Sequence, residues 1–177
     1  MRGTPGASAP SLAPMSLVAP DGGRPTLSSL AGTMATVIVF AGNGCPTVRS
    51  YEDRLMAIQD AWRSHGVNLV AVNANNQFLS PPDTVAEMAT RARDRRFNFP
   101  YLKDEGGVVA RRLGAICTPH AFLLDRDLAV VYSGRIDDSR VGDTISRRDL
   151  ENAIADVVFG RSVSVSRTEP FGCSIVW

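Results

Sequence analysis

The sequence carries no excess of charge of either sign. Nineteen Lys and Arg residues stand against eighteen Asp and Glu residues, which gives a formal net charge of +1. This balance offers no overall electrostatic reason to expect a nucleic acid or an anionic membrane as partner. The sequence also lacks the run of about 18 apolar residues that a membrane-spanning helix needs. We therefore expect a soluble protein with no nucleic-acid or membrane partner and a small, weakly charged substrate.

The N-terminal segment lacks the features of a signal peptide. Residues 1–14 are rich in Gly, Ala, Ser and Pro, carry a single early basic residue and contain no continuous apolar stretch. A signal peptide combines a basic start with an apolar region of about 7–15 residues. We expect residues 1–8 to be a flexible lead-in to a cytoplasmic protein.

Cysteine is scarce, with only Cys45, Cys117 and Cys173 spread along the chain. An odd number of thiols cannot all pair within one molecule, which argues against a disulfide scaffold. Their spacing does not fit a metal site, and the sequence has no glycine-rich phosphate loop, so we expect neither a metal nor another cofactor. Two interpretations remain for these thiols, inert burial or redox chemistry.

The pattern of apolar residues predicts an α/β fold in one domain, residues 9–160. A chain of 177 residues with 44% hydrophobic residues is enough for one sizeable core. The segments expected to be regular are an N-terminal hairpin at 12–30, strands at 35–40 and 67–72, a hairpin at 120–124 and 129–132, and helices that begin at Pro46 and Ser80 and span 108–113 and 148–159. This alternation predicts a central sheet with helices on both faces. Residues 161–177 should form an extended tail, pinned by Phe171, Ile175 and Trp177.

Cys45 has the context that most strongly favours chemistry. It follows the buried strand at 35–40 and a Gly-Asn-Gly turn, and it precedes Pro46, which suits the first turn of a helix. The partial positive charge of a helix N-terminus lowers the pKa of a thiol and favours the nucleophilic thiolate. The sulfur would also lie at the carboxyl end of a central strand, where α/β sheets bind ligands. The alternative is that Cys45 is a small buried apolar residue.

Thr118-Pro119 stands immediately before the strand expected at 120–124. A proline at this place suits a turn with a cis peptide bond, although the trans form is more frequent for X-Pro bonds in general. Taken alone, the local sequence leaves both forms open.

The order of these elements and several motifs resemble the redoxin branch of the thioredoxin superfamily, which includes the alkyl hydroperoxide reductase and thiol-specific antioxidant proteins. The resemblance runs from about Ala9 to Phe159. The motifs most similar to a bacterial peroxiredoxin-like subfamily are Cys45-Pro-Thr-Val, Phe99-Pro-Tyr-Leu-Lys-Asp-Glu, Cys117-Thr-Pro, Gly134-Arg-Ile-Asp-Asp, Arg148-Asp-Leu and Gly172-Cys-Ser-Ile-Val-Trp. The resemblance implies a thioredoxin-like fold with a central mixed sheet, a cis bond before Pro119, and a thiol-based oxidoreductase that has antioxidant activity.

The resemblance also defines a candidate site and its departures from the family. The cysteine of the peroxiredoxin pattern Pro-x-x-x-Thr-x-x-Cys matches Cys45, but its proline and threonine positions hold Ile38 and Gly42. The first cysteine of the thioredoxin Cys-x-x-Cys motif would also be Gly42. The implied substrate pocket comprises Gly42, Asn43, Gly44, Pro46, Thr118 and Pro119. Main-chain N–H groups at the helix start could still polarise a peroxide oxygen.

For several further residues the sequence leaves two interpretations open. Cys117 and Cys173 are the candidate resolving cysteines, with a buried inert thiol and a tail anchor as the respective alternatives. Arg135 could activate the thiolate, although an ion-pair cluster with Asp137 and Asp138 is the simpler interpretation. His120 could contact Cys45 or simply pack in its strand, and the basic stretch at 91–96 is expected to be a solvated helix face.

Two enzymatic hypotheses and one alternative of another class follow. Cys45 either reduces a small hydroperoxide or exchanges with a disulfide substrate, with Cys117, Cys173 or a thioredoxin-type reductant restoring the thiol. The third hypothesis is a redox-silent binding domain, for which the glycine at position 42 is the motivation. The oligomeric state stays open, with a homodimer as one alternative.

Overall fold

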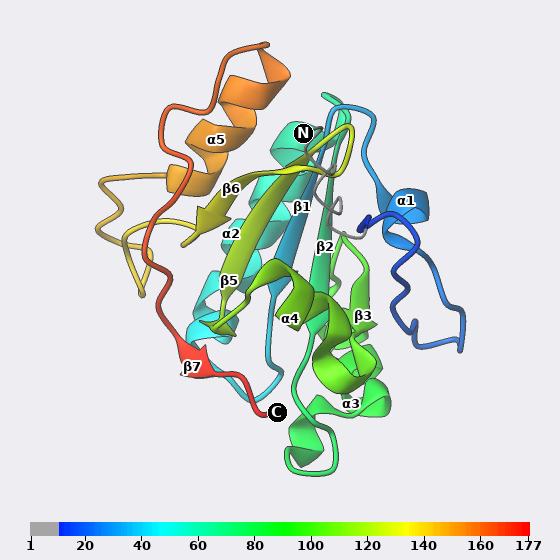
Figure 1. The fold of residues 1–177 in the computed structure, drawn as a ribbon. Helices are drawn as coiled ribbons and strands as arrows, with labels where there is room; N and C mark the ends of the chain where they lie inside the picture. The colour runs from blue at the N-terminus through cyan, green and yellow to red at the C-terminus, as the bar shows by residue number, and fades with distance from the viewer. Residues whose placement is uncertain (1–10) are drawn as a thin grey trace, which may run out of the picture.

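A computed structural model describes residues 11–177, so the predicted flexible segment at 1–8 lies outside the described residues. Within the described part, five strands form the central sheet in the order β3-β2-β1-β5-β6 (Figure 1). These strands are β1 (Ala35–Phe40), β2 (Val67–Asn73), β3 (Tyr101–Lys103), β5 (His120–Asp125) and β6 (Val130–Gly134). β2 is parallel to β1 and β3, whereas β5 is antiparallel to β1 and β6. The predicted mixed sheet is confirmed.

Helices cover both faces of this sheet, as predicted. They are α1 (Leu27–Leu30), α2 (Pro46–Arg63), α3 (Val85–Arg95), α4 (Val108–Leu113) and α5 (Asp149–Val158), with short 3-10 turns at Pro81–Asp83 and Glu105–Gly107. Buried side chains of α2, α3 and α5 share one apolar cluster with the sheet, and buried residues of α1 and α4 share the other. The carboxyl ends of the parallel strands β1, β2 and β3 lie at one edge of the sheet.

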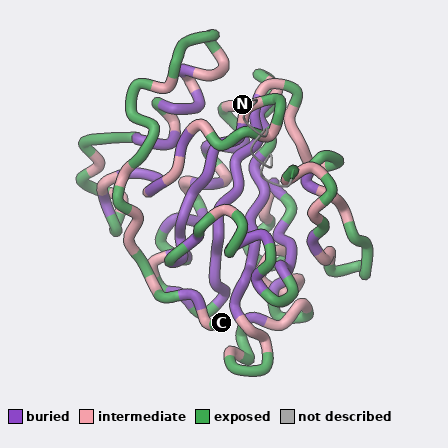
Figure 2. The backbone as a smooth tube through the Cα atoms, in the orientation of Figure 1, coloured by how far each residue is buried: buried purple, intermediate pink, exposed green. Residues whose placement is uncertain are grey.

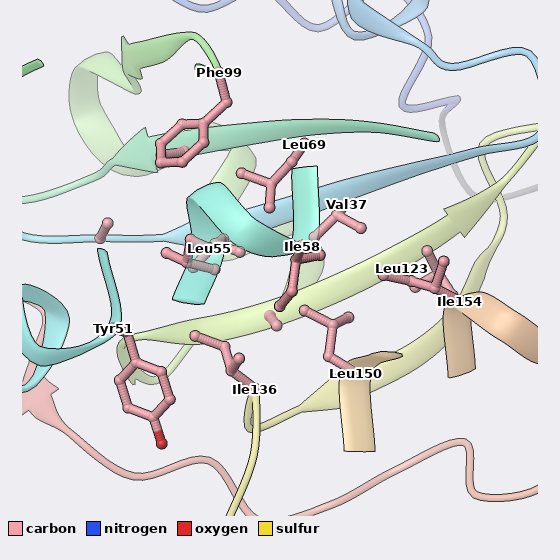
Figure 3. Close-up of a cluster of buried hydrophobic side chains, with 14 of the residues drawn as sticks. Val37, Tyr51, Leu55, Ile58, Leu69, Phe99, Leu123, Ile136, Leu150 and Ile154 are labelled. Atoms are coloured by element: carbon pink, nitrogen blue, oxygen red, sulfur yellow. The ribbon is translucent and has the colours of Figure 1, made fainter. Parts of the chain in front are cut away.

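β1 lies at the centre of both clusters and is buried over its whole length. Because successive side chains of a strand point to opposite faces, Val37 and Val39 join one cluster while Ile38 and Phe40 join the other. Figure 2 shows the sheet as the buried centre of the molecule. Figure 3 shows apolar side chains of α2 and α5 meeting those of the strands. This packing fixes the end of β1, and with it the turn that leads to Cys45.

An ion-pair cluster joins α3 to α2. Glu52 of α2 is only 3% exposed, and its carboxylate accepts hydrogen bonds from Arg91 Nε and Nη2 at 2.7 and 2.8 Å. Arg95 Nε donates to the same carboxylate at 2.9 Å. A buried carboxylate requires such paired charges. The prediction that 91–96 is a solvated helix face is therefore wrong for Arg91, whose guanidinium group pairs with a glutamate on the inner side of α2. Arg95 pairs with the same carboxylate but stays exposed, as predicted.

Only part of the predicted N-terminal hairpin forms. Ser16 and Thr26 form an isolated antiparallel bridge, and Gly22 has φ +84° in the turn between the two arms. The second arm does not stay extended, because Thr26 caps the helical turn α1 by accepting a hydrogen bond from the Ser29 N–H. The prediction also missed β3, which has only three residues and therefore no alternation long enough to indicate a strand.

The C-terminal tail, residues 161–177, runs past the sheet and reaches the end of β1. It first contacts β6 through a bridge between Ser133 and Arg167. It then forms β7 (Cys173–Ser174), which pairs antiparallel with β4 (Cys117–Thr118). Figure 1 shows this path from α5 down to β7. Among residues 11–177, no helix is both long and apolar enough to cross a membrane.

Candidate functional site

Cys45 lies at the N-terminus of the longest helix. It is the N-cap residue of α2, and Pro46 takes the first helical position as the sequence predicts. The Cys45 N–H donates to Gly42 O at 3.1 Å, which closes the turn after β1. The residue is 5% exposed. The helix dipole and the N–H groups of the first turn favour a negative charge here, so the reduced sulfur is placed where a thiolate is stabilised.

The sulfur of Cys45 is bonded to that of Cys173 across 128 residues of chain, with a Cα–Cα distance of 6.0 Å. The register of β4 with β7 produces this pairing, because Thr118 lies opposite Cys173 and Cys117 lies opposite Ser174. A side chain on Gly172 would collide with the Thr118 carbonyl, so the glycine lets the tail approach this closely. The tail therefore places Cys173, rather than Cys117, against the helix N-terminus.

Cys117 remains a buried thiol. Its Sγ lies 3.6 Å from Pro119 O, and the structure records no disulfide for it. Burial, and to a lesser degree the charge of Glu169, raises the pKa of the Cys117 thiol. A raised pKa disfavours the reactive thiolate. Of the two candidate resolving cysteines, only Cys173 is joined to Cys45 in the structure.

The Thr118-Pro119 peptide bond is cis, as the resemblance implies. Thr118 O lies 3.2 Å from Cys45 Sγ. In the disulfide the sulfur carries no proton, so this is a polar contact; after reduction the carbonyl can accept a hydrogen bond from the thiol. The loop before Pro119 thus packs directly against the Cys45 turn.

The remaining predicted pocket residues line the turn before Cys45. The Asn43 N–H donates to Asp83 Oδ1 at 2.6 Å, and Asn43 Nδ2 donates to Pro82 O at 2.9 Å. Gly44 is exposed, and a Cβ built on it would lie 3.8 Å from Pro82. Residues at 81–83 therefore hold the turn from the side of α3.

A buried polar cluster behind this turn was missed at the level of sequence. It consists of Asn73, Asn75, Asp83 and Lys103. Asp83 Oδ1 accepts from Asn73 Nδ2 at 2.7 Å, and Asp83 Oδ2 accepts from Asn75 Nδ2 at 2.9 Å. Lys103 Nζ donates to Asn73 Oδ1 at 3.1 Å, to Asp83 O at 2.8 Å and to Asn75 O. We refer to these four residues as the polar cluster.

In the polar cluster, burial acts against hydrogen bonds and neighbouring charges in setting the pKa values of Asp83 and Lys103. Burial alone would raise the pKa of Asp83, but hydrogen bonds led by that from Ser80 outweigh burial and lower it. Burial lowers the pKa of Lys103, whereas the charges of Asp83 and Asp104 act in the opposite direction.

The sequence did contain a signal for the polar cluster. The polar stretch Asn73-Ala-Asn75 follows one buried strand, and Lys103 ends the neighbouring parallel strand. Parallel strands bring such residues to one edge of the sheet.

The last residues of the tail are fixed to the polar cluster. The Val176 N–H donates to Asn75 Oδ1 at 2.9 Å, and the Asn76 N–H donates to Val176 O at 2.6 Å. Trp177 stacks under Arg111, whose Cζ lies 4.3 Å from the ring centroid. Trp177, Asn75 and Arg111 are among the residues around a pocket of about 430 Å³. The tail therefore forms both the cover of Cys45 and one wall of this pocket.

Arg135 has a different partner from the one expected. Arg135 Nε donates to Asp149 Oδ2 at 2.7 Å, while Asp137 accepts from Arg54. The predicted cluster is wrong in its direct ion pair, because Asp149 at the start of α5 takes the Arg135 guanidinium group and Asp137 pairs with Arg54, whereas the charge of Asp138 does act on Arg135. Within the described residues no contact joins Arg135 to Cys45, so its activating role has no support in the geometry.

His120 packs in its strand. Its Nδ1 accepts from the Ile116 N–H at 3.3 Å, and its Nε2 lies 3.0 Å from Ser133 Oγ. Since Nδ1 accepts, the proton is on Nε2, which donates to Ser133. Burial, with the charge of Arg167 as a second cause, lowers the pKa of His120 to about 4. The ring is therefore a neutral structural group and not a base at Cys45.

Comparisons with solved structures give two similar proteins of comparable length. An uncharacterized conserved protein from Geobacillus kaustophilus is 34% identical, with a TM-score of 0.87 over 96% of this chain and 91% of that one. A hypothetical protein from Sinorhizobium meliloti is 31% identical, with a TM-score of 0.87 over 94% and 92%. Peroxiredoxin Q of Xanthomonas campestris is 20% identical, with a TM-score of 0.55 over 67% and 77%, and shares the fold.

A secreted disulfide oxidoreductase of Mycobacterium tuberculosis has the same fold, with 19% identity and a TM-score of 0.55 over 66% of this chain and 80% of that one. No curated protein matches the sequence. The redoxin family profile matches residues 4–154, which include the whole sheet, the helix that begins after Cys45 and the cis proline. With this match and the thioredoxin-like arrangement of its sheet and helices, the chain belongs to the redoxin family.

Proposed function

We propose that this redoxin is a thiol peroxidase in which Cys45 reduces a small hydroperoxide and Cys173 resolves the oxidised product. The observation that carries the proposal is the disulfide between the cysteine at the N-terminus of α2 and a cysteine 128 residues away on the tail. A disulfide at the position that favours a thiolate is suited to turnover, since that thiolate is both a good nucleophile and a good leaving group.

The proposed reaction has three balanced steps. The Cys45 thiolate attacks the terminal oxygen of ROOH; a sulfur–oxygen bond forms, the oxygen–oxygen bond breaks, and the leaving alkoxide takes a proton to give ROH. The Cys173 thiol then attacks the sulfenic acid, which forms the disulfide and releases water. A dithiol reductant finally receives the disulfide bond, and both cysteines return to thiols.

The tail must move during this cycle. Cys45 is 5% exposed beneath the tail, so a peroxide reaches its sulfur only after the disulfide is reduced and Cys173 withdraws. β7 has two residues, and hydrogen bonds between Val176 and residues 75–76 supplement its pairing. A contact this small can open and close repeatedly, because segments with few hydrogen bonds lie at the low end of local stability.

Thiol–disulfide exchange is the second candidate function. The observation that favours it is Gly42, which provides no side-chain hydroxyl at the position where the peroxiredoxin pattern has threonine. In this case the Cys45 thiolate attacks a disulfide substrate and a mixed disulfide forms as one substrate thiol leaves. Cys173 then attacks the mixed disulfide, which forms the Cys45–Cys173 disulfide and releases the second substrate thiol. Both functions use the same two cysteines, and they differ in which compound oxidises the reduced protein.

Trapping of the sulfenic acid separates these functions. We expect that the Cys173→Ser variant, treated with one equivalent of hydrogen peroxide, accumulates a dimedone adduct on Cys45. Cys117→Ser is the matched control and should form the Cys45–Cys173 disulfide as the wild type does. If no adduct forms while a small disulfide still oxidises the wild-type pair, the exchange function replaces the peroxidase. If Cys45→Ser reacts as the wild type does, Cys45 carries neither function. If neither peroxide nor the small disulfide oxidises the reduced wild type, both functions fail and a redox-silent domain remains.

The proposal extends to partner and compartment. A thioredoxin-type dithiol is the reductant we propose, and the cytoplasm is the location. Cytoplasmic thiols keep structural disulfides reduced, so a disulfide in that compartment is expected to be transient and catalytic. Reduction of the purified disulfide by thioredoxin with its reductase and NADPH, followed at 340 nm, tests the partner.

A further inference from the structure

The hydroxyl group of Thr118 stands out because it makes no hydrogen bond within the described part of the chain. The residue is 1% exposed, and its Oγ1 is buried without a hydrogen-bond partner among the described residues. Buried hydroxyl groups nearly always have a partner, so an exception calls for a specific explanation. The main-chain carbonyl of the same residue lies 3.2 Å from Cys45 Sγ. The unpartnered hydroxyl is therefore part of the immediate surroundings of the reactive sulfur.

The space at Gly42 shows where this hydroxyl lies. A Cβ built on Gly42 would be 3.4 Å from Thr118 Oγ1, 2.7 Å from Asn75 Nδ2 and 3.7 Å from Cys45 Cβ. A threonine at position 42 would thus occupy space that now belongs to the Asn75 amide and border on the Thr118 hydroxyl. Two polar groups from other parts of the chain converge on the position that the peroxiredoxin pattern gives to a threonine side chain.

The orientation of Asn75 follows from its partners. Its Nδ2 donates to the Asp83 carboxylate, which can only accept, and its Oδ1 accepts from the Val176 N–H, which can only donate. The NH2 group is therefore the end of the amide that lies next to Gly42. One of its two hydrogens is used by Asp83, and the other has no hydrogen-bond partner among the described residues.

We propose that the Thr118 hydroxyl and the Asn75 amide replace the missing threonine by positioning and polarising the hydroperoxide at Cys45. This inference rests on the proposed peroxidase function. When the Cys45 thiolate attacks the terminal oxygen, negative charge develops on the oxygen that leaves as alkoxide. A hydrogen bond from Thr118 Oγ1 stabilises this charge, as fixed donors do in other sites. The alkoxide then takes its proton from water.

The tail explains why the hydroxyl lacks a partner in the oxidised protein. Thr118 lies opposite Cys173 in the β4–β7 pair, so the segment that carries the resolving cysteine covers it. When that segment withdraws after reduction, the space next to Gly42 becomes accessible together with the sulfur. The Thr118 donor is therefore available in the state that meets the peroxide.

The test compares two reactions of the same thiolate. In a background with Cys117 and Cys173 replaced by Ser, we expect Thr118→Val to slow oxidation of Cys45 by hydrogen peroxide about 100-fold. Alkylation of Cys45 by iodoacetamide and its pH profile should stay unchanged, because alkylation needs no donor for a leaving oxygen. Thr118→Ser, which keeps the hydroxyl, should retain most of the peroxide rate. Thr118→Ala serves in place of Val if the valine variant does not fold.

The outcomes separate this inference from the proposed function. If Thr118→Val reacts with peroxide as fast as its parent, or if alkylation slows by the same factor as oxidation, the role of Thr118 is overturned while the peroxidase function stands. If the parent with Thr118 intact does not react with peroxide at all, the proposed function fails and this inference fails with it.

Discussion

The two segments that flank Cys45 differ in what holds them. On the side of α3, the buried polar cluster and the hydrogen bond from Asn43 to Asp83 fix the turn, and none of these contacts involves a cysteine. On the side of the tail, the disulfide and a two-residue β pairing hold Cys173 in place. Under the proposed function the first segment stays in place through the cycle while reduction releases the second, as a resolving cysteine requires.

The largest expected effect comes from disrupting the polar cluster. Asp83→Ala removes the carboxylate that accepts from Asn73, Asn75, Ser80 and the Asn43 N–H, and it leaves these donors and Lys103 without it. Loss of one charged member of a buried cluster costs about 3–5 kcal/mol. Urea unfolding should show this loss equally in the oxidised and reduced protein. The exposed Asp143→Ala is the control, and a loss for Asp83→Ala as small as that of the control would contradict the assignment.

Reduction of the disulfide should release the C-terminal tail. The Cys45–Cys173 bond closes a loop of 128 residues, and removal of such a cross-link lowers the free energy of unfolding by about 2–5 kcal/mol. Urea unfolding with and without dithiothreitol measures this. Cys117→Ser should respond as the wild type does, whereas Cys173→Ser should show no dependence on dithiothreitol. A wild type that is equally stable in both conditions would contradict the redox dependence of the tail.

A smaller effect is expected at Gly42, where Asn75 of the polar cluster meets the Cys45 turn. Gly42→Ala places a Cβ 2.7 Å from Asn75 Nδ2, and overpacking of this kind costs about 1–3 kcal/mol. Gly44→Ala is the matched control in the same turn, since its Cβ would meet only Pro82 at 3.8 Å. Thermal unfolding of the two variants should therefore differ. Equal melting temperatures would show that Asn75 does not fill the place of a side chain at position 42.

The effect expected at His120 is confined to acid pH. Burial holds its pKa at about 4, below its ordinary value near 6.5, so the unfolded chain binds a proton in this interval and the folded chain does not. This contribution to stability is complete above about pH 6.5 and is lost as the pH falls toward 4. Urea unfolding across this range should show a slope that His120→Asn reduces. An unchanged slope in the variant would mean that other groups cause it.

The sequence predicted the elements whose signals are local. The β-branched strand, the glycine turn and Pro46 identified β1, the start of α2 and the position of Cys45 between them. The sequence could not show whether Cys117 or Cys173 pairs with Cys45. The two cysteines lie close together in the β4–β7 pair, and the register of β7 against β4 decides which of them faces Cys45. Sequence spacing carries no information on that register.

The polar cluster and the ion pairs were missed for a related reason. Asn75, Asp83 and Lys103 come from three separate segments, and each alone is typical of a loop or a strand end. Arg135 was assigned to its neighbours in sequence, although Asp149 approaches it through the packing of α5. Polar residues at the ends of parallel strands were the signal that could have indicated the cluster.

Mapping of the disulfide formed during turnover shows whether Cys173 resolves the oxidised Cys45. The fully reduced protein is treated with one equivalent of hydrogen peroxide, its free thiols are alkylated, and the nonreducing digest is analysed by mass spectrometry. We expect one linked pair, Cys45 with Cys173, and an alkylated Cys117. A Cys45–Cys117 link, or alkylation of all three cysteines after peroxide has been consumed, would contradict this expectation.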